Sequence, residues 1–181
     1  MKDSNLLKNY QKFKSKNIAL IGHMGSGKST MGKLIAKKLK LKHFDSDQLI
    51  ENNTRKTINQ IFDTEGELGF RIIEEKIILK FRNKKNIVLT LGGGSILSTK
   101  IRDLLKNEYI TLFLDVDIST LIKRLKKSSR RPLLLNVNIE KKIKELDAIR
   151  RQYYLLADIT LKNCKNPIET LSDFLIKYNK L

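Results

Sequence analysis

Tryptophan is absent from this chain of 181 residues, and it holds only one cysteine, two prolines and nine glycines. A single cysteine cannot form an internal disulfide. No uninterrupted apolar run approaches the roughly 20 residues that a membrane-spanning helix needs, and residues 1–16 lack the apolar stretch of a secretory signal. The sequence therefore predicts a soluble, cytoplasmic protein with no membrane partner.

Acidic residues are also scarce, since 19 Asp and Glu stand against 37 Lys and Arg for a net charge of +18. Such a charge suits nucleic-acid binding, attraction of a small anion, or simply a solvated basic surface. The lysines are scattered from Lys2 to Lys180 and form no single basic block. This spread favours the solvated surface, although charge alone leaves all three interpretations open.

Short apolar segments alternate with amphipathic ones along a chain whose length suits one domain, preceded by a basic extension at 1–16. Strands are predicted at 17–22, 42–45, 87–91, 109–114 and 158–161. Helices are predicted within 46–64 and at 28–40, 65–81, 98–106, 118–127, 139–156 and 167–178. This alternation predicts an α/β fold in which helices cover both faces of a parallel sheet.

The most specific motif is Gly22-His23-Met24-Gly25-Ser26-Gly27-Lys28-Ser29, which matches the phosphate-binding pattern G-x-x-x-x-G-K-[ST]. It follows a predicted strand and opens a predicted helix, as the chemistry requires. Its backbone N–H groups and the helix N-terminus attract phosphate oxygens. Lys28 is expected at the β- and γ-phosphates of a nucleotide and Ser29 at Mg²⁺, whereas His23 receives no role.

Two carboxylates, Asp45 and Asp47, follow the second predicted strand. Residues two apart in an extended segment point the same way, so both can project beside the phosphate loop. One would hold Mg²⁺ through water and the other would take the hydroxyl of a phosphoryl acceptor. Alternatively, Asp47 caps the following helix.

Two further segments indicate a substrate site. Arg71, with Glu74 one turn later to hold it, would grip a substrate carboxylate, unless the two form a surface ion pair. Gly92–Gly94 follow the strand at 87–91, where open α/β sheets bind ligands. Three glycines exceed what a tight turn needs, so we expect a ligand to approach the backbone closely there.

Arginine pairs occur in two places downstream. Arg130 and Arg131 precede Pro132 in a segment between two predicted helices. A loop of this kind either stabilises charge during phosphoryl transfer or is merely exposed and basic. Arg150 and Arg151 lie near the end of the helix predicted at 139–156.

In this order and spacing, GHMGSGKST, DSD, GELGFR, LGGGS and RRPLL resemble the shikimate kinase family. The resemblance implies Mg²⁺-dependent transfer of the ATP γ-phosphoryl group to the 3-hydroxyl of shikimate, a step toward aromatic amino acids. It further implies the fold of nucleoside monophosphate kinases, a five-stranded parallel sheet in the order 2-3-1-4-5, with a lid near 126–138. A monomer without a nucleic-acid partner is expected.

Carried over residue by residue, the resemblance assigns the site. ATP would contact Gly25, Ser26, Gly27, Lys28, Ser29, Thr30, Arg124 and Arg131. Shikimate would contact Asp47, Phe62, Phe70, Arg71, Gly92, Gly93, Gly94 and Arg150. Lys28, Asp47 and Arg131 would be catalytic, and Ser29 would ligate Mg²⁺ with Asp45 assisting through water.

One departure from the family pattern concerns Arg150. The family usually shows R-x-P-x-Y, whereas this chain reads Arg150-Arg151-Gln152-Tyr153-Tyr154. Without the proline, Arg151 competes with Arg150 for the carboxylate. Gluconate kinases, nucleoside monophosphate kinases and an ATP-dependent nucleic-acid-binding protein stay as alternative functions.

Overall fold

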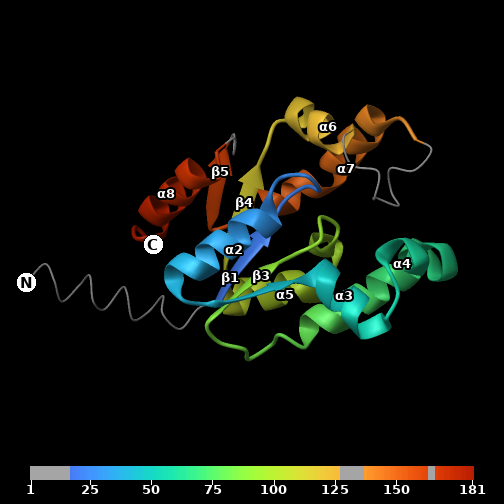
Figure 1. Cartoon of the computed structure of the whole chain (residues 1–181), viewed down its shortest axis with the longest axis horizontal. Helices are drawn as coiled ribbons and strands as arrows, with labels where there is room; N and C mark the ends of the chain where they lie inside the picture. The colour runs from blue at the N-terminus through green and yellow to red at the C-terminus, as the bar shows by residue number, and fades with distance from the viewer. Residues whose placement is uncertain (1–16, 127–136, 163–165) are drawn as a thin grey trace, which may run out of the picture.

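The computed structural model describes residues 17–126, 137–162 and 166–181 (Figure 1). The predicted basic extension at 1–16, most of the predicted lid and Arg131 lie outside the described residues. No helix within the described ranges is long and apolar enough to cross a membrane.

Five strands form one parallel sheet in the order β2-β3-β1-β4-β5, which confirms the predicted topology. The strands are β1 (Asn17–Ile21), β2 (Lys42–Asp45), β3 (Ile87–Thr90), β4 (Tyr109–Asp115) and β5 (Ile159–Lys162). In register, Thr90 of β3 lies between Leu20 of β1 and Asp45 of β2. The loops that follow these three strands therefore emerge side by side.

The helices are α2 (Lys28–Leu39), α3 (Ser46–Thr54), α4 (Ile58–Leu79), α5 (Thr99–Glu108), α6 (Ile118–Lys126), α7 (Ile139–Tyr154) and α8 (Pro167–Tyr178), with a 3-10 turn η1 at Ser95–Leu97. Most of the predicted helices agree with these bounds to within two residues. Pro167 stands at the first turn of α8, where its missing N–H costs no helical hydrogen bond.

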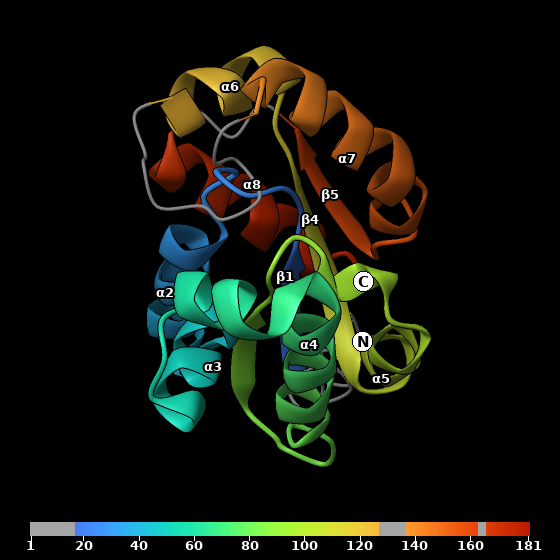
Figure 2. The same ribbon diagram turned by 90° about the vertical axis from the view of Figure 1, so that its right-hand side faces the viewer.

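Two apolar layers lie on opposite faces of the sheet. Ile18 and Leu20 of β1 pack with residues of α2 and α8. The alternate residues Ala19 and Ile21 pack with residues of α4, α5 and α7. This period of two is what a strand buried on both faces produces, and Figure 2 shows α2 and α5 on opposite sides of the strands.

The helix predicted at 65–81 begins earlier than expected, at Ile58. Thr57 and Gln60 form a reciprocal capping box that starts α4, a local signal that the hydrophobic periodicity did not include. Gly66 then interrupts the helix with φ 66° and ψ −176°, which is a bend that glycine accommodates readily. The predicted start at Glu65 therefore marks this bend and not the start of the helix.

Helices α6 and α7 lie side by side beyond the carboxyl ends of the strands (Figure 2). Met24 of the loop after β1 is buried among Leu121 and Leu125 of α6 and Ile143 and Leu146 of α7. The glycine-rich loop is thus packed directly against these two helices.

Candidate active site

The loop after β1 curls through backbone conformations that glycine adopts readily. Gly25 and Gly27 have φ of 79° and 95°, in the left-handed region that other residues rarely adopt. Lys28, at the start of α2, is buried, and its Nζ donates hydrogen bonds of 2.8 Å to the carbonyls of Gly22 and His23. The ammonium charge is therefore held within the curl of the loop, where nucleotide phosphates would lie.

Asp45 links this loop to α3. Its Oδ2 accepts a 2.6 Å hydrogen bond from the Ser29 hydroxyl, and its Oδ1 accepts one of 3.0 Å from the Asp47 N–H. Asp45 is thus the N-cap of α3, so the alternative that Asp47 serves as the cap was wrong. The adjacent hydroxyl and carboxylate oxygens are hard ligands of the kind Mg²⁺ prefers.

Side chains from three elements crowd the backbone of Gly92–Gly94. A Cβ on the first glycine would lie 3.1 Å from Oδ1 of Asp47, and one on the second would lie 3.4 Å from Nη1 of Arg150. A Cβ on the third would overlap the guanidinium of Arg71. The bare backbone of the three glycines therefore lets Asp47, Arg71 and Arg150 lie against one segment, which brings the three side chains together.

The glycine segment also touches the phosphate loop. A Cβ on Gly93 would lie 3.2 Å from the carbonyl oxygen of Gly22 and 3.3 Å from the backbone nitrogen of Met24. The Asp47–Arg71–Arg150 group and the phosphate loop are therefore neighbours within one site.

Arg71 is held by two carboxylates of its own helix. Its Nη1 lies 2.7 Å from Glu74 and its Nη2 lies 3.0 Å from Glu67. Burial opposes the charge, but Glu74 and Glu67 outweigh it and raise the pKa of Arg71. Glu74 is only 1% exposed and also accepts a 2.6 Å hydrogen bond from Ser95. The alternative of a surface ion pair is therefore wrong.

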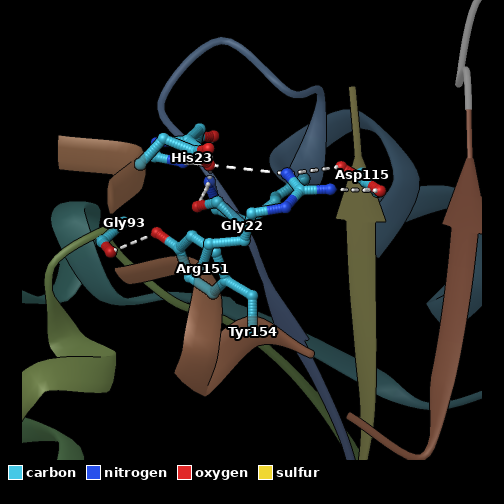
Figure 3. Close-up of polar contacts among 8 residues, drawn as sticks. Gly22, His23, Gly93, Asp115, Arg151 and Tyr154 are labelled. Atoms are coloured by element: carbon cyan, nitrogen blue, oxygen red, sulfur yellow. Dashed lines mark hydrogen bonds and ion pairs between the residues drawn. The ribbon is translucent and has the colours of Figure 1, made fainter. Parts of the chain in front are cut away.

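Arg150 and Arg151 point in different directions. Arg150 is 1% exposed, and its Nε and Nη1 have no hydrogen-bond partner among the described residues. Burial lowers the pKa of Arg150 and outweighs the raising effect of Tyr154, while the nearby Arg71 charge adds to the lowering. Arg151 has a 42% exposed side chain and donates to Asp115 at 3.1 and 3.3 Å, at the end of β4 (Figure 3). Only Arg150 therefore lies at the glycine segment.

Phe62 and Phe70 of α4 lie together, with ring centroids 4.8 Å apart. Phe70 is buried beside Ile50, Ile61 and Ile77, whereas Phe62 is partly exposed. Of the two, Phe62 offers the more accessible ring face.

A cavity of about 250 Å³ lies beside the phosphate loop. It is lined by Gly25, Ser26, Gly27, Thr30, Met31, Leu114, Arg124, Pro167 and Thr170. Arg124 of α6 donates a 3.0 Å hydrogen bond to the Gly25 carbonyl. Five residues predicted to contact ATP thus line one cavity.

Two site contacts escaped the sequence reasoning. His23 is 4% exposed, and its Nε2 lies 2.8 Å from Asp147 of α7. Tyr154 donates a 2.5 Å hydrogen bond to the carbonyl of Gly93 (Figure 3). Each contact joins residues far apart in the chain, 124 and 61 positions respectively, and no local pattern signals such pairs.

Comparison with known proteins agrees with this geometry. The family model for shikimate kinase matches residues 24–178, which is most of the chain. The chain belongs to the shikimate kinase family.

Members of the family resemble it in both sequence and structure. The shikimate kinase of Legionella pneumophila (strain Corby) is 39% identical over 91% of this chain and 95% of that protein. That of Buchnera aphidicola subsp. Baizongia pistaciae is 48% identical, over 57% of this chain and 59% of its own length. A shikimate kinase from Acinetobacter baumannii, solved in complex with shikimate, has a TM-score of 0.85 at 34% identity, covering 92% of this chain and 94% of that one.

More distant structures share the fold alone. A gluconokinase from Sinorhizobium meliloti 1021 has a TM-score of 0.56 at 17% identity over 92% of this chain and 93% of that one. Such similarity extends the fold beyond the shikimate kinase family and carries no function.

We expect the His23 environment to make stability pH-dependent. Burial lowers the pKa of this imidazole, and the contact with Asp147 only partly opposes that effect. The unfolded chain therefore binds more protons than the folded one just below pH 6.5. The free energy of unfolding should fall as pH drops below 6.5, by at most about 1.4 kcal/mol per pH unit for this group.

Denaturant melts of the wild type and His23→Phe between pH 7.5 and 5 check this expectation. The slope of the free energy of unfolding against pH should be shallower in the variant. Burial also lowers the pKa of His43, but this residue is present in both proteins and contributes equally to both slopes. Parallel slopes would show that His23 does not contribute.

Proposed function

We propose that this chain transfers the γ-phosphoryl group of ATP to the 3-hydroxyl of shikimate, giving 3-phosphoshikimate and ADP. The observation that carries the proposal is the buried, unpartnered edge of Arg150 beside Arg71 and Asp47 at the glycine segment. The shikimate-bound relative from Acinetobacter baumannii supports the choice of substrate.

The two arginines suit a carboxylate. A buried cation without a partner is costly, and Arg150 stands in that condition at Nε and Nη1. A substrate carboxylate would accept charge-assisted hydrogen bonds from it and from Arg71. Glu74 and Glu67 already fix the Arg71 guanidinium, so one side of this clamp is preorganised before the substrate binds.

Asp47 suits the hydroxyl to be phosphorylated. It lies in the first turn of α3 with its Oδ1 against Gly92, and the neighbouring Gly93 packs on the phosphate loop. A hydroxyl between Asp47 and the phosphate loop would lie close to the γ-phosphate. Asp47 would accept its proton as the oxygen attacks phosphorus. Phe62, Phe70 and the backbone of Gly92–Gly94 would enclose the ring.

The nucleotide would lie over the phosphate loop, with its base in the cavity beside Arg124. Lys28 would stabilise charge on the β- and γ-phosphates. Ser29 would ligate Mg²⁺, and Asp45 would hold one of its waters; the ion would neutralise phosphate charge. Arg131, outside the described residues, stays a predicted lid residue. The monomeric state, the cytoplasmic location and the absence of a nucleic-acid partner also stay predictions.

A coupled assay of ADP release tests the function. With ATP and Mg²⁺, shikimate should support turnover, whereas gluconate and nucleoside monophosphates should not. Chelation of Mg²⁺ should abolish the activity. Preference for another acceptor would contradict the proposal, and salt-sensitive binding to polynucleotides without turnover would favour the nucleic-acid alternative.

The two aspartates should fail differently. Asp47→Asn should lower kcat by about 100-fold or more, because it removes the proton acceptor, while the KM for ATP changes little. Asp45→Asn should weaken the Mg²⁺ site but preserve the helix cap, since asparagine caps as well as aspartate. Raising the Mg²⁺ concentration in steady-state assays should therefore restore part of the Asp45→Asn activity alone. An equal response of both variants would refute this division of roles.

Arg150 and Arg151 provide a matched pair. Arg150→Ala should raise the KM for shikimate about tenfold or more, since losing a charge-assisted hydrogen bond costs roughly 1.5–3 kcal/mol. Arg151→Ala should change it by less than about threefold, because that side chain faces Asp115. Initial rates at saturating ATP compare the two variants, and the reverse order would show that Arg151 binds the carboxylate.

A further inference from the structure

A partly buried hydrogen bond joins the phosphate loop to the helix that carries Arg150. His23 Nε2 lies 2.8 Å from Asp147 Oδ1, with side chains 4% and 14% exposed. Asp147 stands three residues before Arg150, one turn earlier on the same face of α7. The pair therefore fixes the loop and this turn of α7 relative to each other.

Other contacts of α7 surround this link. The Tyr154 ring lies edge-on to His23, with centroids 5.1 Å apart, while its hydroxyl bonds to Gly93. Arg151 lies 3.5 Å from Asp147, and it also contacts Asp115 (Figure 3). The helix is thus anchored to the phosphate loop, the glycine segment and the end of β4.

Arg150 depends on these anchors because its side-chain partner, Tyr154, belongs to the same helix. Arg71 is held by Glu67 and Glu74, whereas Nε and Nη1 of Arg150 have no partner within the described part of the chain. Without a local carboxylate, the position of its guanidinium follows from the position of α7. Any shift of that helix would therefore move Arg150 relative to the glycine segment.

We propose that His23 and Asp147 are positioning residues for the substrate carboxylate: their hydrogen bond holds α7 so that Arg150 lies at the glycine segment. The inference rests on the proposed function. It assigns His23 and Asp147 no contact with the substrate, because their effect passes through Arg150.

The chemistry of the pair suits a fixed link. Burial lowers the pKa of His23, and the charges of Arg150 and Lys28 act in the same direction against the raising effect of Asp147. At neutral pH the imidazole is then uncharged and donates its Nε2–H to the carboxylate. It joins the two segments without adding another cation next to Arg150 and Lys28.

A double-mutant cycle with Arg150 tests the proposal. His23→Phe keeps a ring against Tyr154 but removes the donor, and Asp147→Ala removes the acceptor. In the otherwise wild-type chain, each should raise the KM for shikimate about three- to tenfold at saturating ATP. In the Arg150→Ala background, each should raise it less than about twofold, because the residue they position is gone.

Two controls separate positioning from general destabilisation. Glu145→Ala removes an exposed carboxylate of the same helix, which lies 3.8 Å from Lys142 and takes no part in the His23–Asp147 contact, and it should leave the KM unchanged. Asp147→Asn retains an oxygen that accepts from Nε2–H, so its KM should stay within about twofold of wild type. Thermal melts check that each variant is folded. If Asp147→Ala does not fold, the comparison of His23→Phe with Asp147→Asn still tests the proposal.

The outcomes separate cleanly. Equal increases in KM in both backgrounds, or no increase in the wild-type background, would overturn the positioning role while leaving the proposed function intact. Absence of shikimate turnover by the wild-type chain would overturn the proposed function and this inference with it.

Discussion

The site depends on the space left by three missing side chains at the end of β3. Gly92–Gly94 present bare backbone. The Arg71 guanidinium occupies the place where a Cβ on Gly94 would stand, and Asp47 and Arg150 lie in close contact with Gly92 and Gly93. These three side chains come from α3, α7 and α4, which are far apart in the sequence. A Cβ on Gly94 would displace the Arg71 side chain, and one on Gly92 would clash with Glu74. A Cβ on Gly93 would instead press on the backbone of the phosphate loop, so the convergence of the three helices on this segment rests on its bare backbone.

That convergence places two guanidinium groups close together, and the protein neutralises only one of them internally. Arg71 has Glu74 and Glu67, whereas the buried Arg150 keeps two nitrogens without a partner among the described residues. Folding alone does not favour such an arrangement, because an unpaired buried charge destabilises the folded state. Local rules of this kind are most often broken at functional sites, where a bound ligand supplies the missing partner.

The sequence predicted those features that depend on local motifs or on the resemblance that these motifs carry. Strand order followed from the motif resemblance, and the phosphate loop and the Arg71–Glu74 pair each lie within a few residues. The start of α4 was missed because a capping box at Thr57 overrides the weak periodicity there. His23–Asp147 and Tyr154–Gly93 were missed because they depend on how α7 packs across the strand ends, which no single segment encodes.

Gln152 lies within α7 at the position where the family pattern usually has a proline. A proline inside a helix removes one backbone hydrogen bond and tends to bend the chain, whereas α7 runs unbroken from Ile139 to Tyr154. In a regular helix, residues spaced three or four apart share a face. Asp147, Arg150 and Tyr154 therefore form one stripe toward the phosphate loop and the glycine segment. Arg151, about 100° further round from Arg150, is left to bind Asp115.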